Sequence, residues 1–265
     1  MLPRQIDAMT ELQNAFKLLF NNWILALPTA ISSLLFMVLF FFFVAAAIGS
    51  MVGAGALGGD HPTGAMALLS GFGVVGFVLF IVAALVALVA NATVVAAAQD
   101  VWKGRGPDLG GAVGQAMGKL PHLIVAAIII ALLAIIPGLL AIFFIGFLLL
   151  IALGFFMMYV VPGIMVGGES GSSAIGASFR LAKENFGPSA LAFVGIVVVV
   201  VAGQIVSTIF SHIIGLNFIV AFVVGGLASA YGALVSVRFY DLLKGGAPPA
   251  VATGSAPPPM PTSNP

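Results

Sequence analysis

The sequence predicts an all-α, polytopic membrane helix bundle with six transmembrane helices in three hairpins, each preceded by a short amphipathic interfacial helix. Hydrophobic residues make up 62% of the 265 residues and charged residues only 6%, whereas a soluble domain has about 25% charged residues. The charges also cluster between long uncharged runs. Those runs are long enough for helices to cross a hydrocarbon core of about 30 Å. We therefore expect an integral membrane protein.

The interfacial helices are predicted from apolar residues that recur at steps of four, three and four, which places them on one helical face. The three sets are Leu12, Phe16, Leu19 and Trp23; Leu109, Val113, Ala116 and Leu120; and Ile175, Phe179, Ala182 and Phe186. Each set precedes a pair of apolar segments. This order indicates a repeated unit of interfacial helix and membrane hairpin, although so apolar a chain can also produce the spacing by chance.

The ends of two of these helices carry capping signals. Asp108 is a predicted N-cap of the second helix, which Pro121 would end. Ser172 or Ser173 is expected to cap the third helix, and Gly187-Pro188 to stop it.

The first predicted hairpin consists of residues 23–51 and 66–98, which carry no formal charge. A glycine-rich loop at 52–65, containing Asp60 and His61, would join them. The polar segment 1–22 precedes this hairpin. It does not resemble a signal peptide, whose apolar core would come sooner and be shorter.

The second predicted hairpin lies within residues 122–168, which are too long for one span, because a continuous helix would measure about 70 Å. The chain must turn inside this segment. Pro137-Gly138 has the stronger turn chemistry and is favoured. A turn near Gly146 would divide the length more evenly and leave Pro137 as a kink.

The third predicted hairpin comprises residues 189–211 and 218–237, with a tight turn between them. The tail, 245–265, is rich in proline and small polar residues and is expected to be disordered. The domain organisation is therefore an N-terminal cytoplasmic amphipathic segment at 1–22, a membrane domain at 23–244 and a tail at 245–265.

The orientation follows from the basic residues, all nine of which fall on one side of a six-span topology. They are Arg4, Lys17, Lys103, Arg105, Lys119, Arg180, Lys183, Arg238 and Lys244. The positive-inside rule makes that side cytoplasmic. We expect a bacterial inner-membrane protein with both termini in the cytoplasm.

The sequence argues against catalytic chemistry. It has no cysteine, and no ionisable residue is expected at mid-depth in a span, where functional charges of membrane proteins usually lie. We predict no catalytic residue, metal or cofactor, and a net charge of +1 gives no reason to expect nucleic acid. Neutral polar residues do occur in the spans. They are Asn91, Thr93, Gln204, Ser207 and Thr208, read as interhelical hydrogen-bonding groups or, alternatively, as a polar substrate path.

Two further sets of residues are candidate contact sites. Small residues on the sixth span, at steps of four, three and four, predict close helix packing inside the bundle or in a homo-oligomer; they are Gly225, Ser229, Gly232 and Ser236. A basic cytoplasmic belt is predicted to contact anionic lipid headgroups or a protein partner. It consists of Lys17, Lys119, Phe179, Arg180, Lys183, Phe186 and Arg238, the last alternatively a snorkelling anchor.

Short motifs resemble a loose group of bacterial six-span membrane proteins that includes the membrane domain fused to some glycerophosphodiester phosphodiesterases. The matching residues are Pro162, Ala174, Ser178, Leu181, Asn185 and Phe186, together with Ile136-Pro137-Gly138 and Tyr240-Asp241-Leu242. The chain departs from the group at Gly167, where a glutamate is frequent; Glu169 follows two residues later. The resemblance implies the six-span fold and no agreed activity, since the phosphodiesterase chemistry belongs to a separate soluble domain.

The leading hypothesis is a non-enzymatic membrane protein that organises or senses lipid, or docks a partner, through its basic amphipathic helices. The alternative is a transporter or permease for an uncharged or lipid substrate. A polar-lined cavity at mid-depth would favour the alternative, whereas a packed bundle with exposed basic helices would favour the leading hypothesis.

Overall fold

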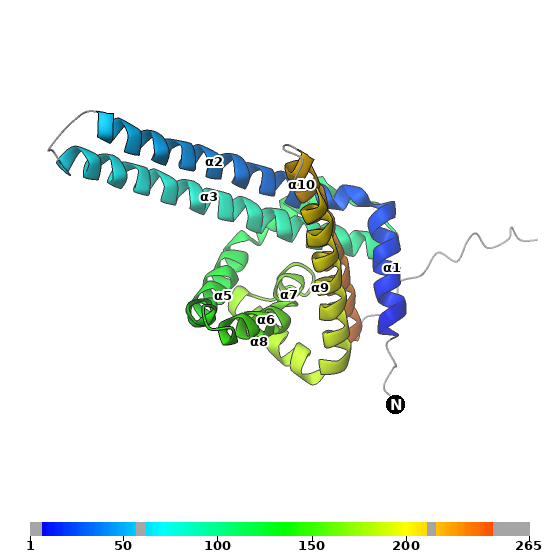
Figure 1. Cartoon of the computed structure of the whole chain (residues 1–265). Coiled ribbons are helices and arrows are strands. Elements are labelled where there is room, and N and C mark those ends of the chain that lie inside the picture. The colour runs from blue at the N-terminus through cyan, green and yellow to red at the C-terminus, as the bar shows by residue number, and fades with distance from the viewer. Residues whose placement is uncertain (1–6, 57–61, 211–215, 246–265) are drawn as a thin grey trace, which may run out of the picture.

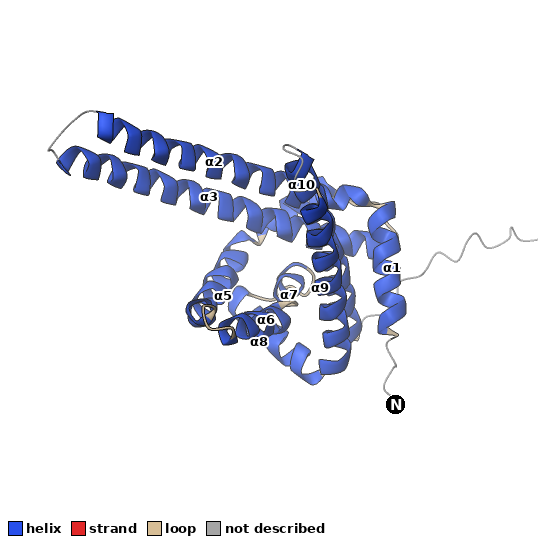
Figure 2. Ribbon diagram, viewed as in Figure 1, coloured by secondary structure: helices blue, strands red, loops and turns tan. Residues whose placement is uncertain are grey.

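The computed structural model describes residues 7–56, 62–210 and 216–245, and within these ranges every regular element is helical. The α-helices are α1 (Ala8–Asn21), α2 (Leu27–Ala56), α3 (Pro62–Trp102), α4 (Leu109–Gly118), α5 (Leu120–Leu140), α6 (Ile145–Met157), α7 (Val160–Met165), α8 (Gly171–Glu184), α9 (Phe186–Ile209) and α10 (Leu216–Leu243). A short 3-10 helix, η1 (Trp23–Ala26), links α1 to α2. The coiled ribbons of Figure 1 and the blue helices of Figure 2 show this all-α arrangement.

Six segments of the described chain are long and apolar enough to cross a membrane, as predicted. They are Trp23–Ala45, Gly76–Trp102, Leu120–Leu140, Ile145–Met165, Phe186–Ile209 and Phe218–Leu243. The order of one short helix followed by two spans occurs three times, beginning at α1, α4 and α8. The chain is therefore an all-α polytopic membrane protein.

The first hairpin is longer than the sequence indicates. Helix α2 continues to Ala56 and α3 begins at Pro62, so both helices enter the predicted loop at 52–65. Asp60 and His61 lie outside the described residues. In Figure 1, α2 and α3 run side by side and extend well beyond the other helices.

The turn inside the second hairpin is not at Pro137-Gly138, contrary to the favoured prediction. Helix α5 continues through Pro137 to Leu140, and the chain turns at residues 141–144. Gly146 lies directly after this turn, and a Cβ atom on it would collide with the backbone of Leu140. The alternative, a turn near Gly146, is the better description because the turn needs a residue without a side chain there.

The short helices pack against the bundle mainly through small residues. The fully buried positions are Ala8, Ala15 and Leu19 in α1, Ala112 and Ala116 in α4, and Gly171, Ala174, Ser178 and Ala182 in α8. Phe16, Trp23, Val113, Phe179 and Phe186 of the predicted stripes are exposed. The small faces allow the helices to lie close to the bundle, so the larger apolar side chains turn outward.

The predicted helix ends are correct in part. The carboxylate of Asp108 accepts a hydrogen bond from the amide of Gly111 at 3.0 Å and caps α4, as predicted. Helix α8 has Ser170 as its N-cap and ends at Glu184, so the expected serine caps and the Gly187-Pro188 stop are wrong. That dipeptide lies in the first turn of α9, where the fixed φ of proline is compatible with a helix start.

The core lies where α3, α7 and α10 meet the short helices. Its largest fully buried side chains include Tyr159, Leu234 and Phe239. The indole of Trp102 donates a hydrogen bond to the carbonyl of Leu234 at 2.9 Å, which ties the end of α3 to α10. Residues 211–215 and the tail from residue 246 lie outside the described residues, so the predictions for the tail remain predictions.

Candidate functional site

A cavity of about 730 Å³ lies between α3, α7, α9 and α10. Its lining residues are Asn91, Val95, Met158, Val161, Pro162, Ile196, Val200, Gln204, Ser207, Thr208, Ala221, Val224, Gly225, Ala228, Ser229, Gly232, Ala233 and Ser236. Over the described residues, the lining mixes apolar side chains with neutral polar ones and includes no ionisable residue. Asn91, Gln204 and Gly225 remain exposed, so the cavity is open rather than sealed. Its volume is typical of pockets that bind small molecules.

The small residues of α10 form one wall of this cavity. All four predicted packing residues, Gly225, Ser229, Gly232 and Ser236, are lining residues. A Cβ atom on Gly225 would meet no atom within 4 Å. Gly232 faces Ile196 of α9 at ordinary contact distance, and closer helix approaches occur at two other glycines. A Cβ atom on Gly203 would lie 2.5 Å from Val224, and one on Gly226 would lie 2.8 Å from the Ala26 carbonyl oxygen.

A second wall comes from the break between α6 and α7. The side chain of Ser178 in α8 accepts a hydrogen bond from the Tyr159 amide at 3.2 Å and donates one to the Phe156 carbonyl at 2.6 Å. Proline at 162 lacks an amide hydrogen, so the helical bond to the Met158 carbonyl cannot form. Irregular backbone at membrane depth is tolerated where protein satisfies it or where it borders a cavity. Here Ser178 satisfies backbone groups of Phe156 and Tyr159, and Met158 and Pro162 line the cavity.

Two of the polar side chains in the spans make hydrogen bonds within their own helices. Thr93 and Thr208 each donate a hydrogen bond to a carbonyl in their own helix, at 2.8 Å. Within the described part of the chain, the amide groups of Asn91 and Gln204 have no protein partner, and both side chains line the cavity. Unpaired amides are costly in hydrocarbon, so these groups require water or a polar ligand. This observation favours the polar-path interpretation.

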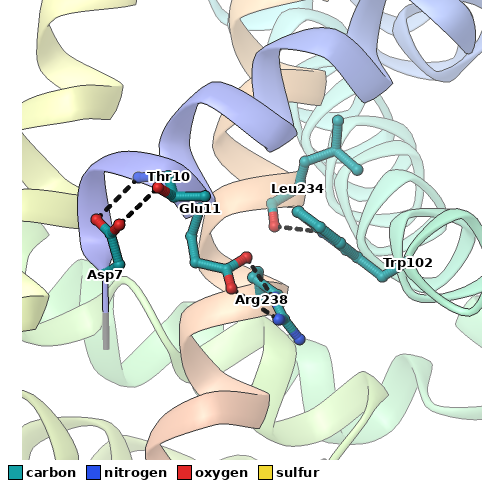
Figure 3. Close-up of polar contacts among 6 residues, drawn as sticks. All are labelled: Asp7, Thr10, Glu11, Trp102, Leu234 and Arg238. Carbon is teal, nitrogen blue, oxygen red and sulfur yellow. Dashed lines mark hydrogen bonds and ion pairs between the residues drawn. The ribbon is translucent and has the colours of Figure 1, made fainter. Parts of the chain in front are cut away.

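Arg238 belongs to the core and not to a lipid-facing belt. Its side chain is 5% exposed and makes two hydrogen bonds, of 2.7 and 2.8 Å, to the carboxylate of Glu11 in α1. The guanidinium also lies 5.1 Å from the ring centroid of Trp102. Figure 3 shows these groups between α1 and α10, beside the Asp7 and Thr10 pair that caps α1. Arg238 is therefore not an exposed lipid-contact residue, because it is buried and paired with Glu11.

Lys119 is also engaged within the protein. Its ammonium group donates hydrogen bonds to the carbonyls of Ile164 and Met165 at 2.8 Å, and Gln115 donates a further one to Met165. These carbonyls end α7, so Lys119 satisfies acceptors that the helix leaves unpaired. Partial burial lowers the pKa of Lys119. Its structural role removes it from the residues best placed to contact lipid.

The position of Gly167 is closed to any side chain. A Cβ atom on Gly167 would collide with the hydroxyl of Tyr240 and lie 2.7 Å from the Gly163 carbonyl oxygen. Glu169 instead pairs with Lys244 and accepts a hydrogen bond from Tyr240 at 3.5 Å. The bond to Glu169 raises the pKa of Lys244. The acid therefore joins the link after α7 to the end of α10.

The remaining belt residues are exposed. Phe179 is 45% exposed and Phe186 62%, although each also contacts a phenylalanine ring of α6. Lys17, Arg180 and Lys183 are exposed and have no ion-pair partner within the described residues. These five side chains remain the candidates for contact with lipid or a partner.

No protein family, curated protein or solved structure was found to match this chain. The fold and the cavity define it as a multi-pass helical membrane protein with an open cavity lined by neutral polar and apolar residues.

Proposed function

We propose that this protein is a non-enzymatic permease or lipid-handling protein that takes an uncharged amphiphilic molecule into the cavity between α3, α7, α9 and α10. The observation that carries the proposal is the pair of unpartnered amides, Asn91 and Gln204, in a cavity of about 730 Å³. From the sequence this function is the alternative hypothesis, and a polar-lined cavity is the feature expected to favour it. We also propose that the protein lies in a bacterial inner membrane with cytoplasmic termini, as the basic residues indicate.

The shape of the cavity suits an elongated ligand. Its lining runs from Ile196 to Thr208 along α9 and from Ala221 to Ser236 along α10. At 1.5 Å per residue these stretches measure about 18 and 22 Å. They cover more than half of a hydrocarbon core of about 30 Å. A molecule with an apolar chain and a polar group matches both the length and the mixed lining.

The test is a substitution that fills the cavity without touching the rest of the fold. Gly225→Phe places a ring into open space on the cavity wall. Val223→Phe is the matched control, because Val223 is exposed on the same helix and outside the cavity lining. We expect the wild type and the control to retain co-purified lipid in native mass spectrometry and to move a fluorescent lipid analogue between leaflets of proteoliposomes. Equal retention and movement in the Gly225→Phe protein would reject the proposal.

A second function is favoured by the outer face of α8. Phe179 and Phe186 are exposed beside Arg180 and Lys183. Apolar rings next to basic groups are typical of helices that lie on an anionic membrane surface. We propose that this face, with Lys17, contacts anionic headgroups or a protein partner. The resemblance to the membrane domain of glycerophosphodiester phosphodiesterases is consistent with either function and also stays a proposal.

A further inference from the structure

The contacts between α9 and α10 define which cavity residues face one another. A Cβ atom on Gly203 would contact Val224, and one on Gly232 would lie 3.6 Å from Ile196. The two helices are therefore antiparallel in a register that pairs the end of α9 with the start of α10. The carboxyl-terminal end of α9 and the amino-terminal end of α10 form one end of the cavity.

The two ends of the cavity differ in chemistry along α9. Gln204, Ser207 and Thr208 follow one another at steps of three and one, so they share a helical face, and all three line the cavity. One to two turns earlier, the lining residues of α9 are Ile196 and Val200. Helices α3 and α7 add Val95 and Val161 to the lining. Along α9 the lining thus passes from polar to apolar residues, while Ser229 and Ser236 of α10 line the cavity on either side of Gly232, which faces Ile196.

The charges of the lining limit the ligand. Among the described residues, no ionisable side chain borders the cavity. A phosphate or ammonium headgroup placed there would lose hydration without gaining an opposite charge, which is costly within a membrane. Amide and hydroxyl groups instead offer both donors and acceptors, which match a neutral hydroxyl group.

We propose that the cavity selects a lipid with a neutral, hydroxyl-bearing headgroup, such as a diacylglycerol. The headgroup lies against Gln204 and Ser207, and an acyl chain runs past Val200 and Ile196. This inference rests on the proposed function, which requires only that some amphiphile enters the cavity. It adds the chemical class of the ligand and the direction in which it lies.

The experiment compares two lipids that differ in one group. The full chain in nanodiscs is titrated with dioleoylglycerol and with dioleoyl phosphatidic acid, which share the glycerol and the acyl chains. We expect dioleoylglycerol to bind at least about tenfold more tightly. Removing the polar end with Gln204→Leu and Ser207→Ala should weaken its binding by about tenfold, since two hydrogen bonds are lost. Gln204→Asn keeps an amide and should retain most of the preference.

The controls separate selectivity from folding. Ser33→Ala removes a hydroxyl that bonds within α2, away from the cavity, and should leave both affinities unchanged. A diacylglycerol with a photoreactive acyl chain should label residues near Val200 rather than near Thr208. If both lipids bind equally and Gly225→Phe still abolishes binding, the headgroup inference is wrong and the proposed function stands. If neither lipid binds, or Gly225→Phe changes nothing, the proposed function is wrong as well.

Discussion

Glu11 and Arg238 lie 227 residues apart in the chain and form a two-point ion pair that joins α1 to α10. The pair is largely sheltered, since the two side chains are only 18% and 5% exposed. Because α10 also forms a wall of the cavity, this contact connects the N-terminal helix to the helix that carries the candidate site. Its geometry leads to the first prediction.

Glu11→Ala should destabilise the protein strongly, because it leaves a buried guanidinium without its counter-charge. Breaking one side of a buried pair costs about 3 kcal/mol or more, which corresponds to a fall in Tm of roughly 6 to 12 °C for a chain of this size. The double variant Glu11→Ala/Arg238→Met removes both charges and should recover much of the loss. Thermal melts in one detergent measure all of these proteins.

The exposed pair between Arg105 and Asp100 provides the control, because the Arg105 side chain is 63% exposed. Asp100→Asn should change stability by less than about 1 kcal/mol. If Asp100→Asn lowers Tm as much as Glu11→Ala does, the burial of the Glu11–Arg238 pair does not account for its effect on stability.

Gly167→Ala should also lower Tm, because the new methyl group would meet Tyr240 and the Gly163 carbonyl oxygen. Overpacking of this kind costs about 1–3 kcal/mol. Gly176 in α8 is the matched control, since a Cβ atom there would meet nothing within 4 Å. Gly176→Ala should raise stability by up to about 1 kcal/mol, the helix-propensity difference. Identical melts for the two variants would contradict the packing around Gly167.

Reversing the charges of α8 should weaken binding to anionic membranes without unfolding the bundle. Arg180→Glu/Lys183→Glu removes two attractions and adds repulsion, an effect of about 2 kcal/mol or more. Salt should shrink it, because exposed charges are screened over about 8 Å at physiological ionic strength. Glu184→Lys should act in the opposite direction. Partition between neutral and anionic nanodiscs at two salt concentrations measures the effect, and an unchanged lipid preference would leave partner docking as the use of this face.

The topology can be tested with reporter fusions. One fusion follows Pro265 and the other is inserted near Asp60, between the first two spans. The positive-inside rule predicts a cytoplasmic C-terminus and an external Asp60. Cytoplasmic signals from both sites would reject the six-span orientation.

The sequence by itself determined the class of the protein and the approximate positions of its six spans. Uncharged apolar runs must form helices to satisfy their backbone in lipid, so the six spans could be located from composition and length. The cap at Asp108 was predictable because an N-cap bond joins residues three apart. The end of α5 was not predictable, because Pro137 is tolerated within a helix when neighbouring packing compensates. The position of the turn depended instead on the contact between Gly146 and the Leu140 backbone.

Only the tertiary structure decided which residues form the candidate site. The spacing of Gly225, Ser229, Gly232 and Ser236 shows that they share a face, and it does not show what that face meets. The register of α9 against α10, fixed by the contacts at Gly203 and Gly232, places this face of α10 along a cavity. In the sequence, Arg238 is indistinguishable from a snorkelling arginine, because its partner Glu11 is near the other end of the chain. Contacts between distant segments depend on how the helices pack together, and the local spacing of residues in the sequence does not reveal that packing.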